Sequence, residues 1–190
     1  VRLVVLSDTS RPRQITAEAS ALAPLLDVGA IDYRRRASNV RRKPGNIAEW
    51  VERAGADFDY MLVLDADSRM TAERVRSLVW QMERRPRLGL LQAGIALVQG
   101  RSRFGRHQRR AARLLGGNFG RGLAAWWGDA GNYWGHNAIM RIDAFRAAVR
   151  LPRLPGRAPL GGEILSHDFV EAAWIRRAGW EVGLDPDASG

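Results

Sequence analysis

The sequence contains no cysteine, a single lysine and no long apolar run, and each absence excludes something. Without cysteine there is no disulfide framework and no thiolate metal site, which fits a reducing compartment. No apolar run approaches the roughly 20 residues that a membrane helix needs. The chain opens at Val1 without an initiator methionine or a signal peptide. It stops at Gly190 just after an expected strand, so we expect it to be a fragment of a larger protein.

What is present suits one globular domain with a strong positive charge. The 190 residues are 46% hydrophobic and 26% charged, which is ordinary for a folded chain. A net charge of +10 implies attraction to phosphates or to anionic membrane surfaces. The stretch 33–46, YRRRASNVRRKPGN, concentrates six cations and ends in what reads as a shaped loop. It fits either a nucleic-acid arm or the wall of a site for one phosphorylated ligand.

Short apolar runs alternate with segments of helical period, which predicts an α/β fold with a largely parallel sheet. The segment 60–68 contains a continuous apolar run, 61–64, typical of a strand buried on both faces. Strands are predicted at 1–8, 30–36, 60–68, 88–98, at the start of 132–149, and at 180–185. Helices are predicted at 16–29, 46–55, 71–86, 102–115, in the rest of 132–149, and at 167–179. Residues 116–122 are predicted as a flexible join and 151–162 as a loop.

Three acids stand where predicted strands end, and ligands of such sheets bind beyond the carboxyl ends of the strands. These are Asp8, Asp65 and Asp67. Alternate residues of an extended segment face the same side, so Asp65 and Asp67 are expected to point together and to need a cation between them. A hard ion such as Mg²⁺ or Mn²⁺, held by carboxylates and phosphate oxygens, meets that need. The alternative is an acidic turn in which Asp67 or Ser68 caps the next helix.

Asp168 also has two interpretations. Its spacing to Glu171 matches a capping box at the start of a helix. A carboxylate in hydrogen-bond reach of an attacking hydroxyl would instead serve as a general base. From this stretch alone the cap is favoured.

The segment around residue 134 combines aromatics with polar side chains. Tyr133 and Trp134 precede His136 and Asn137, and two further tryptophans, Trp126 and Trp127, lie upstream. Aromatic faces pack on sugar rings as readily as on other core side chains, so a sugar site and a core both remain open.

Together these motifs resemble the family 2 processive glycosyltransferases. The resemblance is carried, in this order, by VVLSD, KPGN, VLDADS, YWGHNAIMR and ILSHDFVEAAWIRRAGW. It is closest to the members that build the backbone of osmoregulated periplasmic glucans. It implies a GT-A type fold, here truncated at both ends, and inverting transfer of glucose from UDP-glucose to a growing β-glucan.

The resemblance also implies roles for individual residues. Asp8 would contact the uridine, and Lys43, Gly45 and Asn46 would border the donor pocket. Asp65 and Asp67 would form the DxD pair that binds Mg²⁺ or Mn²⁺, with Asp67 the more direct ligand. Asp168, in Ser166-His167-Asp168, stands at the position of the catalytic base. The acceptor sugar would meet the residues of one segment, namely Trp134, His136 and Asn137.

By the same resemblance, residues 1–190 form one catalytic domain, with a nucleotide-sugar half at 1–100 and an acceptor and catalytic-base half at 101–190. The parent protein would lie in the bacterial inner membrane with this domain facing the cytoplasm, and acyl carrier protein would be a partner. The family's [Q/R]xxRW motif, its first strand and its membrane helices have no counterpart here, so we expect the piece alone to be inactive.

Two other functions fit single features of the sequence. A different nucleotide-dependent transferase, such as a nucleotidyltransferase, would use the same DxD metal pair. A nucleic-acid-binding domain would use the arginine excess and show a steep salt dependence. The arginines of the predicted helices, such as Arg109, Arg110 and Arg113, lie among apolar residues. They fit solvated surface or contact with anionic lipid heads.

Overall fold

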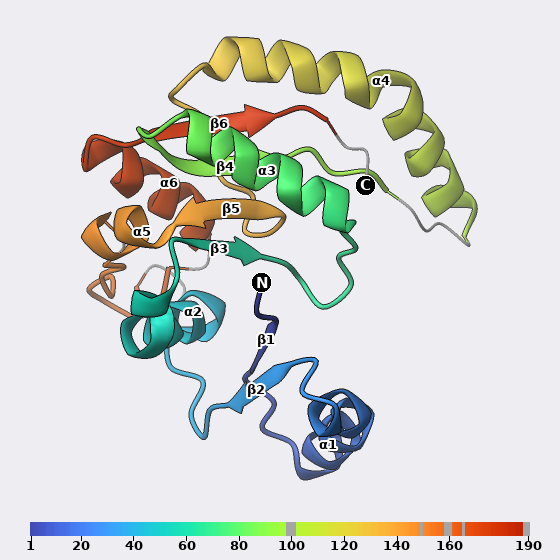
Figure 1. Ribbon diagram of the computed structural model, residues 1–190, viewed down its shortest axis with the longest axis vertical. Coiled ribbons are helices and arrows are strands. Elements are labelled where there is room, and N and C mark those ends of the chain that lie inside the picture. Colours follow the sequence, from blue (N-terminus) through green and yellow to red (C-terminus); the bar gives the residue numbers. More distant parts are fainter. Residues whose placement is uncertain (98–101, 149, 158–160, 165, 188–190) are drawn as a thin grey trace. The chain divides into compact units, whose positions relative to one another are not determined.

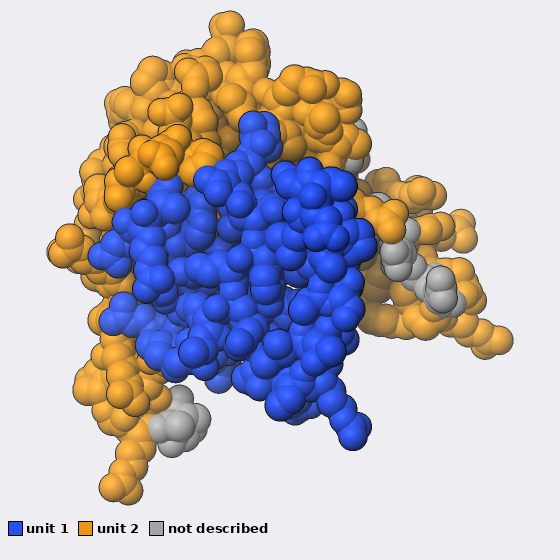
Figure 2. All heavy atoms as spheres, turned by 60° about the horizontal axis from the view of Figure 1, so that its bottom comes forward, with its two compact units in different colours: residues 1–55 blue, residues 56–190 orange. Residues whose placement is uncertain are grey.

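The computed structural model describes residues 1–97, 102–148, 150–157, 161–164 and 166–187. Within them the chain forms two compact units, Val1–Gly55 and Ala56–Gly190, coloured separately in Figure 2. The boundary at Gly55 differs from the division near residue 100 that was expected for the donor and acceptor halves. The assignment of the whole chain to one catalytic domain stays a prediction.

Unit 1 is a small βαβ arrangement followed by a helix (Figure 1). Strands β1 (Val4–Ser7) and β2 (Asp32–Arg35) pair in parallel, with Val4 opposite Asp32 and Ser7 opposite Arg35. Parallel strands need a crossover, and helix α1 (Pro12–Asp27) supplies it. Pro12 stands in the first turn of α1, where its missing N–H costs nothing, so the helix begins four residues before the predicted start.

The predicted loop at KPGN is instead the first turn of helix α2 (Arg42–Ala54). Arg41 and Arg42 take left-handed backbone angles, with φ of 57° and 49°, and turn the chain into the helix. Pro44 occupies the first turn, where a proline is tolerated. The KPGN segment therefore owes its shape to helix initiation. A 3₁₀ turn, Gly55–Asp57, follows.

Unit 2 is built on a four-stranded mixed sheet in the order β3-β5-β4-β6 (Figure 1). The strands are β3 (Tyr60–Val63), β4 (Leu88–Ala93), β5 (Ala138–Arg141) and β6 (Glu181–Asp185). Strand β5 runs antiparallel to both β3 and β4, whereas β4 and β6 pair in parallel. The α/β class is confirmed, but the sheet is less parallel than predicted because β5 inserts between β3 and β4 in the opposite direction.

The α-helices of the described part of unit 2 are α3 (Ala72–Arg84), α4 (Arg103–Trp127), α5 (Ile142–Ala148) and α6 (His167–Arg177). The strand buried along its whole length is β4, whereas β3 lies at the sheet edge and buries only Val63 fully. The prediction that 61–64 is covered on both faces was therefore wrong. The core centres on β4, with Leu78 and Met82 of α3 packed against Leu88 and Leu91.

Helix α4 is the largest departure from the predicted elements. Residues 116–122 were expected to be a flexible join, but they continue the helix from Arg103 to Trp127. Each glycine weakens a helix by up to about 1 kcal/mol without breaking it, and this stretch contains no proline. Helix α4 lies next to β6, and a Cβ added to Gly120 would meet Pro186 at 3.4 Å, so the missing side chain permits close packing. In the described part of the chain no helix combines the length and the apolar character required to cross a bilayer.

Candidate functional site

The DADS segment after β3 is a turn. Strand β3 ends at Val63, and the Ser68 N–H donates to the Asp65 carbonyl at 2.9 Å. The Asp65 N–H in return donates to Ser68 Oγ at 3.2 Å. The expectation that Asp65 and Asp67 continue an extended strand was wrong, because these two hydrogen bonds close the chain on itself. Asp65 is half-buried and Asp67 is exposed.

Ser68 connects this turn to a segment almost 70 positions later. Its Oγ donates to Asn137 Oδ1 at 2.8 Å, and the His136 ring nitrogen Nδ1 lies 2.9 Å from the same oxygen. An amide oxygen only accepts, so this contact is a hydrogen bond in the tautomer that carries its proton on Nδ1. Asn137 is buried and takes a left-handed φ of 52°. The turn that carries Asp65 and the segment predicted to meet an acceptor are thus one hydrogen-bonded group.

Gln92 holds that segment in place, and sequence reasoning missed it. It is fully buried in β4, where its Nε2 donates to the carbonyls of His136 at 3.0 Å and Asn137 at 3.1 Å. Its Oε1 accepts from the Trp134 N–H at 2.9 Å. The available signal was a lone amide inside the apolar run 88–98, because a polar side chain in a buried strand needs partners.

Tyr133 lies at the centre of the acidic part of the site. Its side chain is completely buried, and its hydroxyl makes no hydrogen bond with the described part of the chain. Burial raises the pKa of Tyr133 well above its usual value, and the negative charges of Glu171, Asp168 and Asp65 raise it further. Asp65 and Asp168 come from segments about 100 residues apart. The fold brings both carboxylates to the same region of unit 2, because Ser68 of the Asp65 turn bonds Asn137 and the nearby Gly135 lies beside Asp168.

Asp168 stands in the first turn of α6, beside the segment that carries His136. A Cβ added to Gly135 would lie 3.6 Å from Asp168 Oδ2, and the φ of Gly135 is +85°, so a side chain there would be strained. The N-terminal cap position belongs to Ser166, which makes no side-chain capping bond. The capping box predicted for Asp168 and Glu171 is therefore absent. Asp168 retains only the favourable interaction of a carboxylate with the helix N-terminus.

Glu171 pairs with the preceding turn of α6 instead. His167 Nδ1 lies 3.2 Å from Glu171 Oε1, close enough for an ion pair when His167 is protonated but without hydrogen-bond geometry. Glu171 is buried at the edge of the Tyr133 environment. Glu171 is therefore part of the packing of α6. Asp168 is the carboxylate of this part of the helix that stays partly exposed.

The aromatic residues divide between core and surface. Tyr133 belongs to the core, whereas Trp134 is half-buried and its ring lies 6.0 Å from that of Trp127 at an angle of 60°. Trp126, on the same helix as Trp127, is exposed. The interpretation of these aromatics as core therefore holds for Tyr133. The acceptor role of Trp134 stays a prediction.

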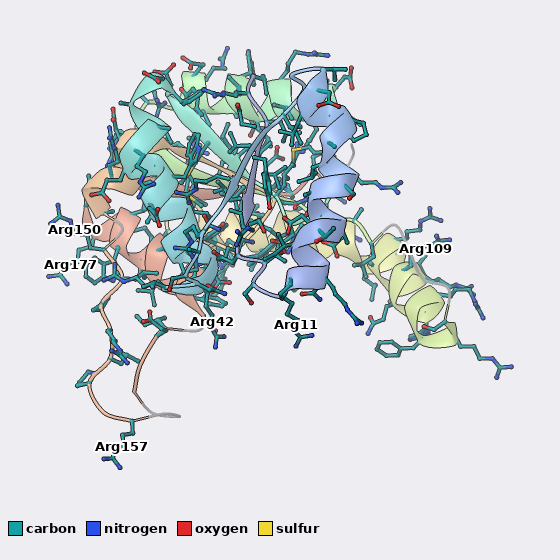
Figure 3. The ribbon with its side chains drawn as sticks, turned by 90° about the horizontal axis from the view of Figure 1, so that it is seen from below. Arg11, Arg42, Arg109, Arg150, Arg157 and Arg177 are labelled. Atoms are coloured by element: carbon teal, nitrogen blue, oxygen red, sulfur yellow. The ribbon has the colours of Figure 1, made fainter. Side chains whose placement is uncertain are left out.

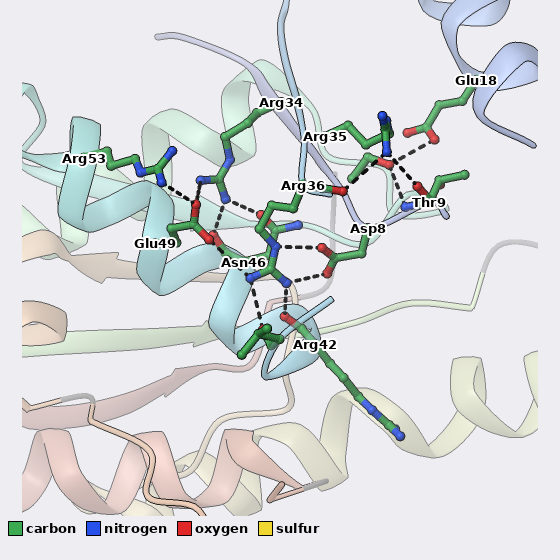
Figure 4. Close-up of polar contacts among 12 residues, drawn as sticks. Asp8, Thr9, Glu18, Arg34, Arg35, Arg36, Arg42, Asn46, Glu49 and Arg53 are labelled. Carbon is green, nitrogen blue, oxygen red and sulfur yellow. Dashed lines mark hydrogen bonds and ion pairs between the residues drawn. The ribbon is translucent and has the colours of Figure 1, made fainter. Parts of the chain in front are cut away.

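In unit 1, Arg34 of β2 and Arg36, directly after this strand, form internal ion pairs (Figure 4). Arg36 binds the Asp8 carboxylate with two bonds, Nε to Oδ1 at 2.8 Å and an Nη to Oδ2 at 2.9 Å. Its side chain is 7% exposed, and the hydrogen bond to Asp8 raises the pKa of Arg36. Arg34 donates to Asn46 and to Glu49, and desolvation by burial lowers the pKa of Arg34.

These ion pairs explain part of the basic stretch 33–46. Arg34 and Arg36 join β2 to β1 and α2 inside unit 1, so they are not surface cations awaiting a polymer of phosphates. The arginines labelled in Figure 3 come from separate parts of the chain, such as Arg42 of α2, Arg109 of α4 and Arg177 of α6. The arginine excess is thus distributed over several elements.

The donor-pocket residues of the KPGN segment have a structural explanation too. A Cβ on Gly45 would lie 2.4 Å from the Val40 carbonyl oxygen and 2.6 Å from Arg41 Cβ, so only glycine fits this first turn. Asn46 is buried and accepts from Arg34. Lys43 is partly exposed. Asp8, Asn46 and Gly45 are therefore held by unit 1 itself, and their contacts with a nucleotide stay predictions.

The carboxylates of the DADS turn suit a hard cation in chemistry and in number. Among the described residues no group of three or more acidic, histidine or cysteine side chains is placed to hold a metal. Asp65 and Asp67 would thus contribute carboxylate ligands from two residues. That set matches Mg²⁺, which typically takes one or two carboxylates together with substrate phosphates and water.

Comparison with known proteins identifies the family. The profile described as Glycosyl transferase family 2 matches residues 1–148. "Glucans biosynthesis glucosyltransferase H" of Rhodopseudomonas palustris is 48% identical over 187 residues, which cover 98% of this chain and 26% of that protein. The proteins of the same name from Xanthomonas campestris and Vibrio cholerae are each 48% identical over 190 residues.

The chain spans between 26% and 30% of the length of these relatives. The family match covers β1 to α5, including the DADS turn and the segment of His136 and Asn137, while the relatives also align through Asp168. The mixed α/β architecture agrees with the GT-A fold expected from the motifs. The chain belongs to glycosyl transferase family 2.

Proposed function

We propose that this chain is the catalytic domain of an inverting glucosyltransferase that moves glucose from UDP-glucose to a growing β-glucan. The names of the relatives support a role in glucan biosynthesis. The structural observation with the most weight is that segment 135–137 meets both carboxylate-bearing segments: Asn137 bonds Ser68 of the Asp65 turn, and Gly135 lies beside Asp168. Transfer requires a donor-side and an acceptor-side carboxylate in one region. A pair that holds a metal cannot easily also act as a base, which leaves that role to Asp168.

In the proposed reaction the acceptor hydroxyl attacks the anomeric carbon from the face opposite UDP. The new bond joins this oxygen to the anomeric carbon, the bond to the UDP oxygen breaks, and UDP leaves with the electron pair. Asp168 takes the proton of the attacking hydroxyl, which requires hydrogen-bond reach. Gly135, in contact with Asp168, leaves room beside the carboxylate.

Asp65 and Asp67 would hold Mg²⁺ or Mn²⁺, which when bound offsets charge on the departing diphosphate. The hydrogen bonds from Gln92 and Ser68 keep the segment of His136 and Asn137 rigid beside them, so that an acceptor sugar can be oriented. In unit 1, Asp8 and the first turn of α2 would bind the nucleotide. The membrane location, and acyl carrier protein as a partner, belong to the same proposal.

The test is Asp168→Asn in the protein at its natural length, with transfer of labelled glucose from UDP-glucose into glucan as the readout. Loss of the general base is expected to lower the rate by about 10² to 10⁴-fold, with UDP-glucose binding retained. Glu163→Gln is the matched control, because Glu163 is an exposed acid five residues earlier. Its rate is expected to equal that of the wild type.

Wild-type glucan synthesis by Asp168→Asn would refute the assignment of the base. A donor screen separates the remaining alternative, a nucleotidyltransferase with the same carboxylate pair. A sugar nucleotide is expected to bind more tightly than a nucleoside triphosphate, and the reverse order would favour that alternative.

A further inference from the structure

Arg36 uses all five N–H groups of its guanidinium inside unit 1. Nε and one Nη nitrogen bind the two oxygens of the Asp8 carboxylate, at 2.8 and 2.9 Å. The same Nη donates to the Arg42 carbonyl at 3.0 Å. The other Nη donates to the Val40 carbonyl at 3.1 Å and lies 3.5 Å from Glu49 Oε2. A guanidinium has five N–H donors and no acceptor, so Arg36 has no donor left for a bound ligand.

These contacts join two segments of unit 1 (Figure 4). Asp8 directly follows β1, whereas Val40 and Arg42 flank Arg41, the residue that caps the start of α2. Arg41 and Arg42 have left-handed backbone angles, which residues other than glycine adopt at a cost in free energy. Because Arg36 binds a carbonyl on either side of Arg41, it holds this strained turn and ties it to Asp8.

The position of Arg36 is itself fixed. Its backbone N–H donates to the Ser7 carbonyl at 3.1 Å, which continues the pairing of β1 and β2 past Arg35. Its side chain is 7% exposed, and its neighbour Glu49 is also bound by other arginines, Arg34 and Arg53. A buried guanidinium among acceptors that are themselves held has little freedom to turn. Arg36 is therefore a rigid link between the end of β1 and the start of α2.

We infer that Arg36 is a positioning residue for the sugar-nucleotide donor. It fixes Asp8 relative to the first turn of α2 and leaves contact with the donor to these two segments. A site assembled from two segments binds more tightly when they are already held in the bound arrangement, because the ligand then does not have to order them. The inference rests on the proposed function, which assigns both segments to the nucleotide.

The first experiment measures donor binding and glucose transfer in the protein at its natural length. Arg36→Lys keeps a positive charge beside Asp8 but loses the planar fork that binds both carboxylate oxygens and the two carbonyls. Its Kd and its KM for UDP-glucose are expected to rise by about 10- to 100-fold, from a small misplacement of the two segments. Its kcat at saturating UDP-glucose is expected to stay near the wild-type value, because the proposed base and metal ligands belong to unit 2.

The division between KM and kcat separates positioning from a loss of folded protein. If Arg36→Lys only lowered the folded fraction, kcat would fall and KM would stay unchanged, and that result would overturn the inference. Arg36→Met, which removes the charge as well, is expected to weaken donor binding at least as much as Arg36→Lys. Arg2→Met is the matched control, because Arg2 pairs with Asp32 in the same unit, with side chains 55% and 44% exposed. Its KM and kcat are expected to equal those of the wild type.

A double-mutant cycle tests whether Arg36 acts through Asp8. Residues in direct contact are expected to show non-additive effects. The rise in Kd caused by Arg36→Lys is expected to be several-fold smaller in an Asp8→Asn background, where the position of residue 8 matters less. An equal rise in both backgrounds would overturn the inference.

Hydrogen exchange of the amides in 39–46 gives a readout that does not depend on catalysis. Without donor, exchange is expected to be slower in the wild type than in Arg36→Lys, and saturating UDP-glucose is expected to narrow the difference. Equal exchange in the two proteins would overturn the inference. Wild-type protein that does not bind UDP-glucose would refute the proposed function and this inference with it. Wild-type binding that both Arg36 variants retain unchanged would overturn the inference alone.

Discussion

At the scale of single residues, the site depends on charges and hydroxyls held out of water. The buried hydroxyl of Tyr133 has no hydrogen-bond partner among the described residues, and the charges of Glu171, Asp168 and Asp65 act on it. A buried hydroxyl without a partner costs free energy, so its presence is not explained by stability alone. Its consequence is a tyrosine that resists ionisation next to the carboxylates on which the proposed reaction depends.

The raised pKa of Tyr133 predicts a loss of stability at alkaline pH. Above pH 10 or so the unfolded chain releases this proton while the folded chain keeps it, so the free energy of unfolding falls as pH rises. Tyr133→Phe removes the effect. Urea unfolding at pH 8 and pH 10.5 is expected to show a smaller drop for Tyr133→Phe than for the wild type. At pH 8 the variant is expected to be equally stable or up to about 1 kcal/mol more stable. Parallel drops in both proteins would contradict the prediction.

Helix α3 carries one buried and one exposed arginine, and we expect their substitutions to lower the free energy of unfolding by very different amounts. Arg74 of α3 donates to Asp185 at 2.7 Å, with the arginine side chain 4% exposed, whereas Arg76 pairs with Glu73 where both side chains are more than 70% exposed. Arg74→Met is expected to cost about 3 kcal/mol, because it removes the cation from a largely buried carboxylate and leaves it with Gln81 and the Asp187 N–H as partners among the described residues. Arg76→Met is expected to cost less than about 0.5 kcal/mol. Denaturant unfolding measures both, and similar costs would contradict the assignment.

At the scale of elements, strand β4 orients a loop through one amide. Gln92 bonds the backbone at Trp134, His136 and Asn137, so β4 sets the path of the chain into β5. Ser68 ties the same path to the turn after β3. Strand β4, the turn after β3 and the segment before β5 thus share one polar network, and the candidate site is built on it.

Gln92→Leu is expected to destabilise the protein by about 2–3 kcal/mol, because the carbonyls of Ala93, His136 and Asn137 and one backbone N–H each lose a hydrogen bond in a buried setting. If the loop orients the acceptor, glucan synthesis is expected to fall by more than this loss of stability explains at a temperature where the variant is folded. Unfolding curves and the glucose-transfer assay give the two numbers. Leu91→Met, a volume-conserving change in the same strand, is the control and is expected to cost less than about 1.5 kcal/mol. Full activity of folded Gln92→Leu would argue against a positioning role.

At the scale of the whole molecule, unit 2 depends on close approach between its sheet and its helices. A Cβ on Gly89 of β4 would lie 2.8 Å from Trp180 Cβ and 3.0 Å from Ala144 Cβ. On α4, by contrast, a Cβ on Gly116 would meet nothing within 4 Å. A side chain at position 89 would therefore clash with its neighbours, whereas one at position 116 would meet open space.

Gly89→Ala is expected to destabilise by about 1–3 kcal/mol through overpacking, and Gly116→Ala to stabilise by about 0.5–1 kcal/mol by reducing the freedom of the unfolded chain. Thermal unfolding of both variants checks the signs. A stabilised Gly89→Ala would mean that α5 and the residues before β6 can move aside. A destabilised Gly116→Ala would mean that the helix is covered there.

The sequence by itself determined the α/β class, the approximate place of most helices and strands, and the residues by which the chain resembles its family. These features are encoded locally, in apolar periodicity, in terminators such as Gly179, and in short motifs such as VLDADS. The start of α2 and the length of α4 were missed because competing local signals, Pro44 and the glycines of 116–122, look like breaks until packing outweighs them.

Only the tertiary structure decided which segments meet. The antiparallel insertion of β5, the Arg36–Asp8 pair, the bonds of Gln92 and the approach of Asp65 and Asp168 to Tyr133 join residues from 28 to more than 100 positions apart. Periodicity within a short window carries no information about such partners, since it records which face is buried and not what covers it. The turn at Asp65–Ser68 also depends on a partner that is distant in sequence, because Ser68 bonds Asn137.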